Sequence, residues 1–400
     1  GRYEKIGDPR FGYATMLKVR ARIVSDSSRS LSKAALIAVR YSAVRLQGPG
    51  IGDKEGPVLD YTQQQWQLFP IVASCYVLHF AGQEMRDNYT RLKDMLAQSA
   101  MGPADLAFLA EMHASTAGLK SYVARMAVED IETCRKLLGG HGYSYFSGLP
   151  LLYGDNVAAY TYEGTPEVLQ QQTGRYILKI LQRAAAGQKI KGSFAYLAQD
   201  LTPNPACDFT SYSHLLQALQ HRSRSACTEL GTSLGAALAA GQDLGFAWNR
   251  HGPMISKACQ SHCQYSVLRS FFASIDKYST ECSTETLGTL KTLGTLWALN
   301  IMFAEFGSFV AAGTLSPDSS PAIREAILSS LDALRPDVVG LIEAFQLPDE
   351  ILATALGTSD GDYVTHLLEM AAKEPLNAQE VLGAYKDSLK PLMQLGRSRL

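Results

Sequence analysis

The chain has 400 residues, of which 46% are hydrophobic and 19% are charged. Such a composition excludes a disordered chain, and the length favours two domains over one simple core. The 37 Lys and Arg residues match 38 Asp and Glu residues, for a formal net charge of −1. This near-neutral charge argues against a protein that binds nucleic acid or a membrane surface.

The apolar runs are short, and LGAALAAG is typical of them. Spanning a bilayer takes roughly 20 apolar residues, so no membrane span is expected. Seven cysteines at irregular spacing indicate a reduced intracellular protein. Cys259, His262 and Cys263 stand together in CQSHC, but no second ligand pair accompanies them. We therefore favour helix residues over a metal site, and no metal is predicted.

Helical periodicity runs through the first part of the chain. Residues 13–47 contain neither Pro nor Gly, and their apolar residues recur at steps of three and four. A second helix is expected over 59–97 with a kink at Pro70, and a third over 103–138. The Gly-, Tyr- and Pro-rich residues 140–160 are expected to form a loop.

A fourth helix is expected from Pro166 to about residue 186, so the first domain (1–186) is predicted to be a four-helix bundle. Residues 187–208 have the composition of a linker. A second helical domain (209–400) follows, and the predicted fold class is therefore all-α. Its helices are expected over 209–250, 253–280, 283–313, 319–346 and 377–394.

The segment RYSAVRLQ places Arg40, Arg45 and Gln47 at the end of the first helix. Arg side chains there can interact with the C-terminal helix dipole, or they can bind an anionic ligand such as a pyrophosphate. The spacing alone favours the interaction with the helix dipole.

The segment GGHGYS also allows two interpretations. Gly139 and Gly140 can simply end a helix or let backbone N–H groups approach a ligand, with His141 as a donor.

The segment TYEGTPEV contains two acids. Thr165 is predicted to be an N-cap and Pro166 the first helical residue, which places Glu167 in the first turn, where the dipole favours an acid. Glu167 thus has a structural explanation, whereas Glu163 has none.

Tyr160 and Tyr162 precede Glu163 in the sequence, and Gly164 follows it. An acid in an apolar pocket formed by these tyrosines would be suited to act as a general base. The alternative is an ordinary surface acid, and the residues taken alone favour that alternative.

The ordered set of RYSAVRLQ, GGHGYS, SGLP and YTYEGTPEV resembles the peroxisomal acyl-CoA oxidases of the acyl-CoA dehydrogenase superfamily. The resemblance covers the chain from FGYATMLKVR to EPLNAQEVLGAYK. It implies FAD as the cofactor, acyl-CoA as the substrate and O2 as the electron acceptor. The implied products are a trans-2-enoyl-CoA and hydrogen peroxide.

The resemblance also assigns roles to individual residues. Glu163 matches the glutamate that removes the α-proton, and its backbone N–H matches a donor to the thioester oxygen, with Tyr162 beside the substrate. The remaining matched residues are expected near the flavin, and two of them would contact the cofactor of the neighbouring subunit, which implies a homodimer. These residues are Arg45 and Gln47 of the neighbouring-subunit contact, Gly139 and Gly140 of a backbone turn, and Thr165.

Two segments depart from the family pattern. RLQGPG stands where Arg-x-Gln is often followed by Phe-Gly, and Glu-Gly-Thr-Pro is closer to the dehydrogenases than to many oxidases. Members of the family also carry an N-terminal helical domain and a β-domain ahead of this region. We therefore expect the chain to work with an N-terminal half of the same enzyme and to bind FAD weakly without it.

Two other functions stay open at this point. One is an acyl-CoA dehydrogenase that passes electrons to an electron-transfer flavoprotein, and the other is a non-catalytic helical scaffold. The final tripeptide Ser398, Arg399 and Leu400 resembles a peroxisomal import signal. It predicts binding to the import receptor and a location in the peroxisome.

Overall fold

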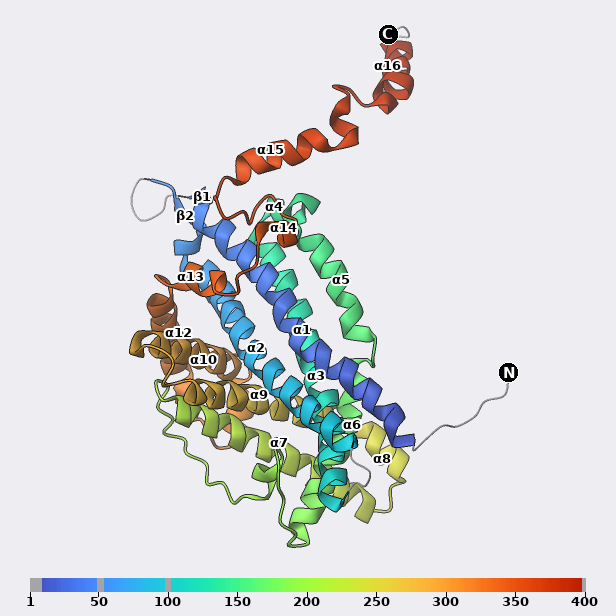
Figure 1. The fold of residues 1–400 in the computed structure, drawn as a ribbon, viewed down its shortest axis with the longest axis vertical. Helices are drawn as coiled ribbons and strands as arrows, with labels where there is room; N and C mark the ends of the chain where they lie inside the picture. The colour runs from blue at the N-terminus through green and yellow to red at the C-terminus, as the bar shows by residue number, and fades with distance from the viewer. Residues whose placement is uncertain (1–8, 49–53, 98–101, 398–400) are drawn as a thin grey trace, which may run out of the picture.

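The computed structural model describes residues 9–48, 54–97 and 102–397, and nearly all of the described chain is helical (Figure 1). The all-α prediction is confirmed. A two-residue antiparallel pair, β1 (Leu46–Gln47) with β2 (Gly56–Pro57), is the one sheet among the described residues. The helices of the first half are α1 (Pro9–Val44), α2 (Thr62–Leu96), α3 (Pro103–Leu137), α4 (Gly140–Tyr143), α5 (Leu149–Thr161) and α6 (Pro166–Ala185).

Four of these helices form the predicted bundle. α1 packs along α2 and α3, and α3 packs against α6. The periodic apolar residues of α1 point inward, because Leu17, Val24 and Leu31 are fully buried. α2 continues through Pro70 as one helix. The helical period of the sequence thus located the four main helices and the buried face of the first one.

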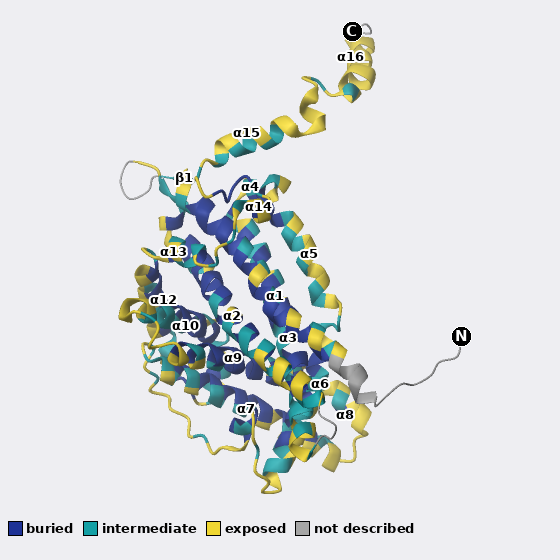
Figure 2. Ribbon diagram, viewed as in Figure 1, coloured by how far each residue is buried: buried dark blue, intermediate teal, exposed yellow. Residues whose placement is uncertain are grey.

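The prediction of a loop over 140–160 is wrong. α4, a 3-10 turn and the 13-residue α5 occupy this segment. Gly148 takes a positive φ of 74° directly before α5, and Pro150 falls in its first turn, where a missing N–H costs nothing. The Gly and Pro residues therefore mark a helix start here. α5 packs on α3 and α1 but keeps much of its surface exposed (Figure 2).

The second half contains shorter helices than predicted. The expected helix over 209–250 is two helices, because Gly241 with φ 82° ends the first and the Asp243 carboxylate caps the second through the Phe246 N–H. The expected helices over 283–313 and 319–346 are also interrupted. The helices observed are α7 (Tyr212–Ala239), α8 (Leu244–Arg250), α9 (Gly252–Lys277), α10 (Thr284–Ala304), α11 (Phe306–Ala311), α12 (Ser320–Leu334), α13 (Val338–Glu343) and α14 (Asp349–Leu352).

α9 joins the two halves of the molecule. It packs against α2 and α6 of the bundle and against α7 and α10 of the second half. The buried apolar residues of both halves form one continuous cluster. The division at residues 187–208 stays a prediction about domains.

The C-terminal residues extend away from the body as an exposed arm (Figures 1 and 2). The arm holds α15 (Tyr363–Lys373), a helix that was not predicted, where Asp362 accepts a hydrogen bond from the Thr365 N–H. The single helix expected over 377–394 is wrong. The arm instead continues as a 3-10 turn (Pro375–Ala378), a π-helical turn (Tyr385–Leu389) and α16 (Lys390–Arg397). None of the described helices is both long and apolar enough to cross a membrane.

Candidate active site

A tight turn between α5 and α6 carries Glu163. Glu163 has φ 59°, a left-handed conformation that few non-glycine residues adopt, and Gly164 follows with φ 109°. Thr165 is the N-cap of α6 and Pro166 its first residue, as predicted, although the Thr165 side chain makes no capping hydrogen bond. The turn therefore presents Glu163 outside both helices, in a backbone conformation that must be held in place.

Arg20 of α1 holds the peptide that follows Glu163. Its Nε donates to the Glu163 carbonyl oxygen at 3.1 Å, and its Nη1 donates to Gln172 Oε1 of α6 at 3.2 Å. The residue is only 4% exposed. Burial lowers the pKa of the Arg20 guanidinium, and the negative charge of Glu163 works in the opposite direction.

Lys120 of α3 holds the same turn from a second side. Its Nζ donates to the carbonyl oxygens of Tyr160, at 3.2 Å, and of Gly164, at 2.6 Å. Burial lowers the pKa of Lys120 to about 8, helped by the charge of Arg20 and opposed by that of Glu163. Two buried cations from two helices therefore fix the backbone on both sides of Glu163.

The polar groups of Glu163 that a ligand would need are free. Its half-buried carboxylate has no hydrogen bond or ion pair with any described residue, and its backbone N–H has no acceptor among them. The two tyrosines considered as walls of a pocket do not enclose the carboxylate within the described residues. Tyr160 donates to the Glu167 carboxylate, and Tyr162 is 51% exposed. This chain alone thus leaves Glu163 open on one side.

A second group of predicted site residues lies at the α4 end of the bundle. Arg45 Nη1 donates to the hydroxyl of Tyr363 at 3.1 Å. The Tyr363 ring packs edge to face on Tyr41, with centroids 5.2 Å apart, and on His141, 6.1 Å apart. The end of α1, the segment after α3 and the start of α15 therefore meet at Arg45.

The backbone around this group is open. Gly139 has φ 60° and ends α3, as predicted, and a Cβ on Gly139 or Gly140 would meet nothing within 4 Å. Gln47 is exposed in β1, and its carbonyl accepts a hydrogen bond from the Tyr61 hydroxyl at 2.7 Å. Arg45 forms no ion pair with a carboxylate in the described part of the chain. An unneutralised guanidinium beside open glycine backbone suits an anionic group such as a diphosphate.

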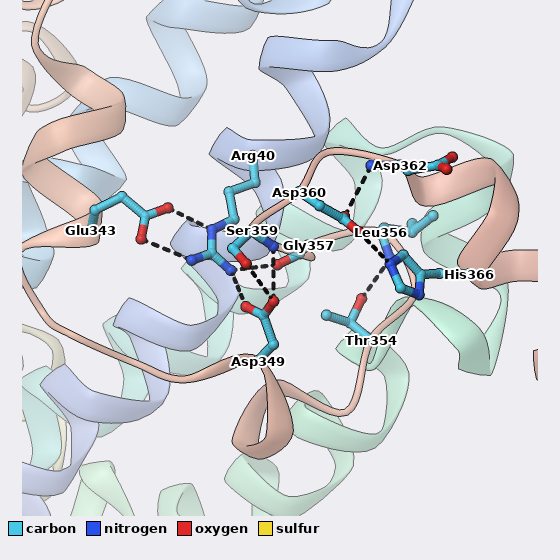
Figure 3. A network of polar contacts seen from close by, with 10 residues as sticks. All are labelled: Arg40, Glu343, Asp349, Thr354, Leu356, Gly357, Ser359, Asp360, Asp362 and His366. Atoms are coloured by element: carbon cyan, nitrogen blue, oxygen red, sulfur yellow. Dashed lines mark hydrogen bonds and ion pairs between the residues drawn. The ribbon is translucent and has the colours of Figure 1, made fainter.

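Arg40 serves neither of the two roles considered for it. Only 8% of its surface is exposed. Its guanidinium donates to both carboxylate oxygens of Glu343, to Asp349 and to the Gly357 carbonyl (Figure 3). These contacts fasten residues 343–357 across the end of α1. Asp349 in turn accepts hydrogen bonds from Ser359, which continues the network toward α15. Arg40 is therefore a structural anchor five residues before Arg45.

The predicted site residues fall into two separate places in one chain. Tyr162, Glu163 and Thr165 lie together between α5 and α6. The second group lies at the other end of α5, beside β1 and α4 (Figure 1). The second group consists of Arg45, Gln47, Gly139 and Gly140. Sequence reasoning missed Arg20, Lys120 and Tyr363, although a lysine inside the run TAGLKSYVA was a signal for Lys120.

The segment CQSHC is part of the interior. Cys259 and Cys263 are fully buried, and His262 is 3% exposed, stacks on Phe194 and shares a hydrogen bond with the Tyr196 hydroxyl at 2.9 Å. Within the described ranges, no group of three or more His, Cys, Asp and Glu residues is arranged to hold a metal ion. These contacts explain the segment as helix core.

A cavity of about 720 Å³ lies between α2, α3, α6 and α9. Its walls include Phe108, Met112 and Tyr176, but none of the predicted site residues. The candidate site is therefore defined by the two groups of contacts described above.

Comparison with known proteins identifies the family. Residues 13–178 match the family "Acyl-CoA oxidase, C-alpha1 domain", and residues 211–394 match the family "Acyl-CoA oxidase". The chain therefore belongs to the acyl-CoA oxidase family, as its motifs predicted.

Individual relatives agree with this assignment. The chain is 34% identical to peroxisomal acyl-coenzyme A oxidase 1 of Rattus norvegicus, over 98% of this chain and 60% of the relative. The structure of Arabidopsis thaliana acyl-CoA oxidase 1 superposes with a TM-score of 0.90 at 32% identity, over 98% of this chain and 59% of that one. The structure of acyl-CoA oxidase-2 of Caenorhabditis elegans, bound with FAD, ascaroside-CoA and ATP, superposes with a TM-score of 0.90 at 29% identity. The match covers 99% of this chain and 58% of that one. The chain thus spans about 60% of the length of the curated relative from Rattus norvegicus.

Proposed function

We propose that this chain is the C-terminal part of an FAD-dependent acyl-CoA oxidase that converts acyl-CoA to trans-2-enoyl-CoA in peroxisomal fatty-acid β-oxidation. The observation that carries the proposal is the held turn at Glu163, with a free carboxylate and a free backbone N–H side by side. Relatives named as peroxisomal acyl-coenzyme A oxidases support it.

The chemistry needs both free groups. The α-proton of a thioester is weakly acidic, so its removal requires a base and a donor to the carbonyl oxygen, where negative charge develops. The Glu163 carboxylate takes the proton, and the Glu163 N–H donates to the thioester oxygen. Arg20 and Lys120 fix the turn, so little reorganisation is needed when the charge develops. Tyr162 stands next to this substrate position.

The second group of residues is the proposed cofactor contact. Arg45 and Gln47 would bind the flavin diphosphate of the neighbouring subunit, and the backbone of Gly139 and Gly140 would approach it closely. Their distance from Glu163 within one chain supports a homodimer in which each protomer contributes to two sites. FAD, when bound, supplies the acceptor for the β-hydrogen as hydride and passes the electrons to O2, which yields hydrogen peroxide. Thr165 lies near the proposed flavin position beside Glu163.

The partner of this chain would be an N-terminal half of the same enzyme. Glu163 is open on one side, and the relatives are longer than this chain. We expect the isolated chain to bind FAD weakly or not at all. Stoichiometric, tight FAD on the isolated chain would contradict this expectation.

The proposed location is the peroxisome, and its proposed determinant is the terminal tripeptide. Ser398, Arg399 and Leu400 lie outside the described residues. Deletion of these three residues from a tagged protein should leave it cytosolic, because the import receptor recognises such a terminus. Unchanged peroxisomal puncta would contradict the assignment.

The alternative functions are separated by the fate of the electrons. An oxidase forms one hydrogen peroxide per enoyl-CoA in air, without another protein. A dehydrogenase needs an electron-transfer flavoprotein, and a scaffold forms no enoyl-CoA. Measuring enoyl-CoA and peroxide from one flavin-loaded sample, with and without an added electron acceptor, distinguishes the three. A one-to-one yield in air supports the oxidase, and enoyl-CoA that forms only with the acceptor overturns it.

A further inference from the structure

Lys120 is a charged residue in the interior of the protein. It lies in the middle of α3, and its side chain is fully buried. A buried ammonium is unfavourable unless its N–H groups find acceptors, and here the acceptors are backbone carbonyls of another segment. The cation therefore has a specific partner, which is the segment that connects α5 to α6.

The two carbonyls bracket Glu163 in sequence. One belongs to Tyr160 in the last turn of α5, and the other to Gly164, directly after Glu163. The first contact satisfies a carbonyl at the end of a helix, where no following backbone N–H donates to it. The second ties the glycine with φ 109° to α3. Lys120 thereby fixes the end of α5 and the residue after Glu163 to α3.

Glu163 depends on such a link because its own backbone is unfavourable. A glutamate at φ 59° keeps that conformation only when its surroundings hold it. Arg20 binds the Glu163 carbonyl from α1, and Lys120 binds the carbonyls before and after it from α3. The two side chains thus act from different helices and on different carbonyls of the turn.

We propose that Lys120 is a positioning residue for the reaction: it clamps the carbonyls of Tyr160 and Gly164 and so sets the place of the Glu163 carboxylate and N–H. This inference rests on the proposed function of Glu163. Lys120 itself touches neither substrate nor cofactor. Its effect on the reaction passes through the backbone of the turn.

The test compares four variants of the complete flavin-loaded enzyme, in which this chain is joined to the proposed N-terminal half. Lys120→Met removes the ammonium and keeps most of the stem, and Lys120→Gln keeps a shorter donor. Thr173→Val is the matched control, because Thr173 of α6 donates to the Ala114 carbonyl of α3 and makes no hydrogen bond to the turn. Glu163→Gln marks the loss of the base.

Two readouts separate positioning from mere stability. The first is kcat and KM for acyl-CoA oxidation. The second is deuterium exchange from solvent into the α-carbon of a 3-thia-acyl-CoA, an analogue that allows α-proton removal without completing the oxidation. For Lys120→Met we expect kcat and the exchange rate to fall together by about 10- to 100-fold, with KM changed by less than about threefold. Lys120→Gln should lie between Lys120→Met and the unmodified enzyme, and Thr173→Val should lower only the unfolding temperature.

The outcomes distinguish a failure of the proposed role of Lys120 from a failure of the proposed function. If the unmodified enzyme is active, Glu163→Gln is inactive and Lys120→Met keeps full kcat and exchange, the role of Lys120 is overturned while the proposed function stands. If the unmodified flavin-loaded enzyme neither oxidises acyl-CoA nor exchanges the α-proton, the proposed function itself fails. If Lys120→Met does not fold, the kcat and exchange of Lys120→Gln decide, and values equal to those of the unmodified enzyme overturn the proposal.

Discussion

The guanidinium of Arg45 donates a hydrogen bond to the hydroxyl of Tyr363 at 3.1 Å, across 318 positions of the sequence. Tyr363 is the first residue of α15, and its ring also packs on Tyr41 and His141. The proposed diphosphate contact is thus built from α1, the segment after α3 and the start of the C-terminal arm. The Arg40 network next to it fastens the same C-terminal segment to α1 (Figure 3).

Replacing Tyr363 by Phe should weaken FAD binding. The change removes the hydroxyl that holds Arg45 and keeps the ring packing, so we expect a two- to tenfold higher Kd, which corresponds to about 0.5–1.5 kcal/mol. Fluorescence titration with FAD measures the effect, on the apo form of the complete enzyme that includes the proposed N-terminal half. Tyr385→Phe in the same arm is the matched control and should leave the Kd unchanged. Equal Kd values for both variants would show that Tyr363 does not orient Arg45.

Replacing Arg40 by Met should destabilise the fold. Glu343 and Asp349 would lose their common partner, and the Gly357 carbonyl would lose its donor, so we expect a loss of about 2 kcal/mol in the free energy of unfolding. Urea denaturation measures this value. Arg22→Met on the same helix breaks an exposed pair with Asp26 and should lose less than about 0.5 kcal/mol. Similar losses in both variants would mean that the network adds nothing specific.

His262 should make the protein sensitive to acid. Burial lowers its pKa to about 3, whereas an unfolded histidine titrates near 6.5. Between these values the unfolded chain binds a proton that the folded chain does not, so stability falls as the pH drops below 6.5, by at most about 1.4 kcal/mol per pH unit for this group. His262→Gln should therefore show a flatter stability curve between pH 4 and 6.5. Parallel curves for the two proteins would contradict a buried neutral histidine.

Replacing Gly164 by Ala should impair the turn. A Cβ there would lie 2.7 Å from Leu169 Cδ2, and φ 109° is unfavourable for alanine. We expect kcat to fall by about 10- to 100-fold, because the neighbouring Glu163 shifts. Gly154→Ala in α5 is the control, since its Cβ meets nothing and alanine favours a helix interior by up to about 1 kcal/mol. A Gly164→Ala enzyme with unchanged kcat would show that the turn tolerates displacement.

The long helices were predictable because each buries a continuous face with the helical period. α1, α2, α3 and α6 lie where this period and the Pro and Gly signals placed them. α5 was missed, since Pro150 and Gly148 are equally common in loops and only their positions relative to a helix start separate the two cases. α15 was missed because it is a short helix with no fully buried residue, and only its side chains Tyr363 and Leu367 pack at the edge of the core of the described chain.

The candidate site was partly predictable. Glu163 stood out because the predicted helix start explained the acid at Glu167 but not the acid at Glu163. The cations that hold its turn, Arg20 and Lys120, lie 143 and 43 positions away. The lysine within TAGLKSYVA was a signal of a buried charge, but no local pattern shows which distant carbonyl it binds. For Arg40, spacing favoured the helix dipole, and its partners Glu343 and Asp349 became visible only in three dimensions.

The most direct test of Glu163 as the catalytic base is the rate of acyl-CoA-dependent peroxide formation by Glu163→Gln, with bound FAD measured in the same sample. We predict a rate at least about 1,000-fold below that of the unmodified enzyme, with the FAD content unchanged. Glu167→Gln, four residues away, should stay within about twofold of the unmodified rate. A Glu163→Gln enzyme that keeps its FAD and at least a tenth of the peroxide rate would contradict the assignment of Glu163 as the base.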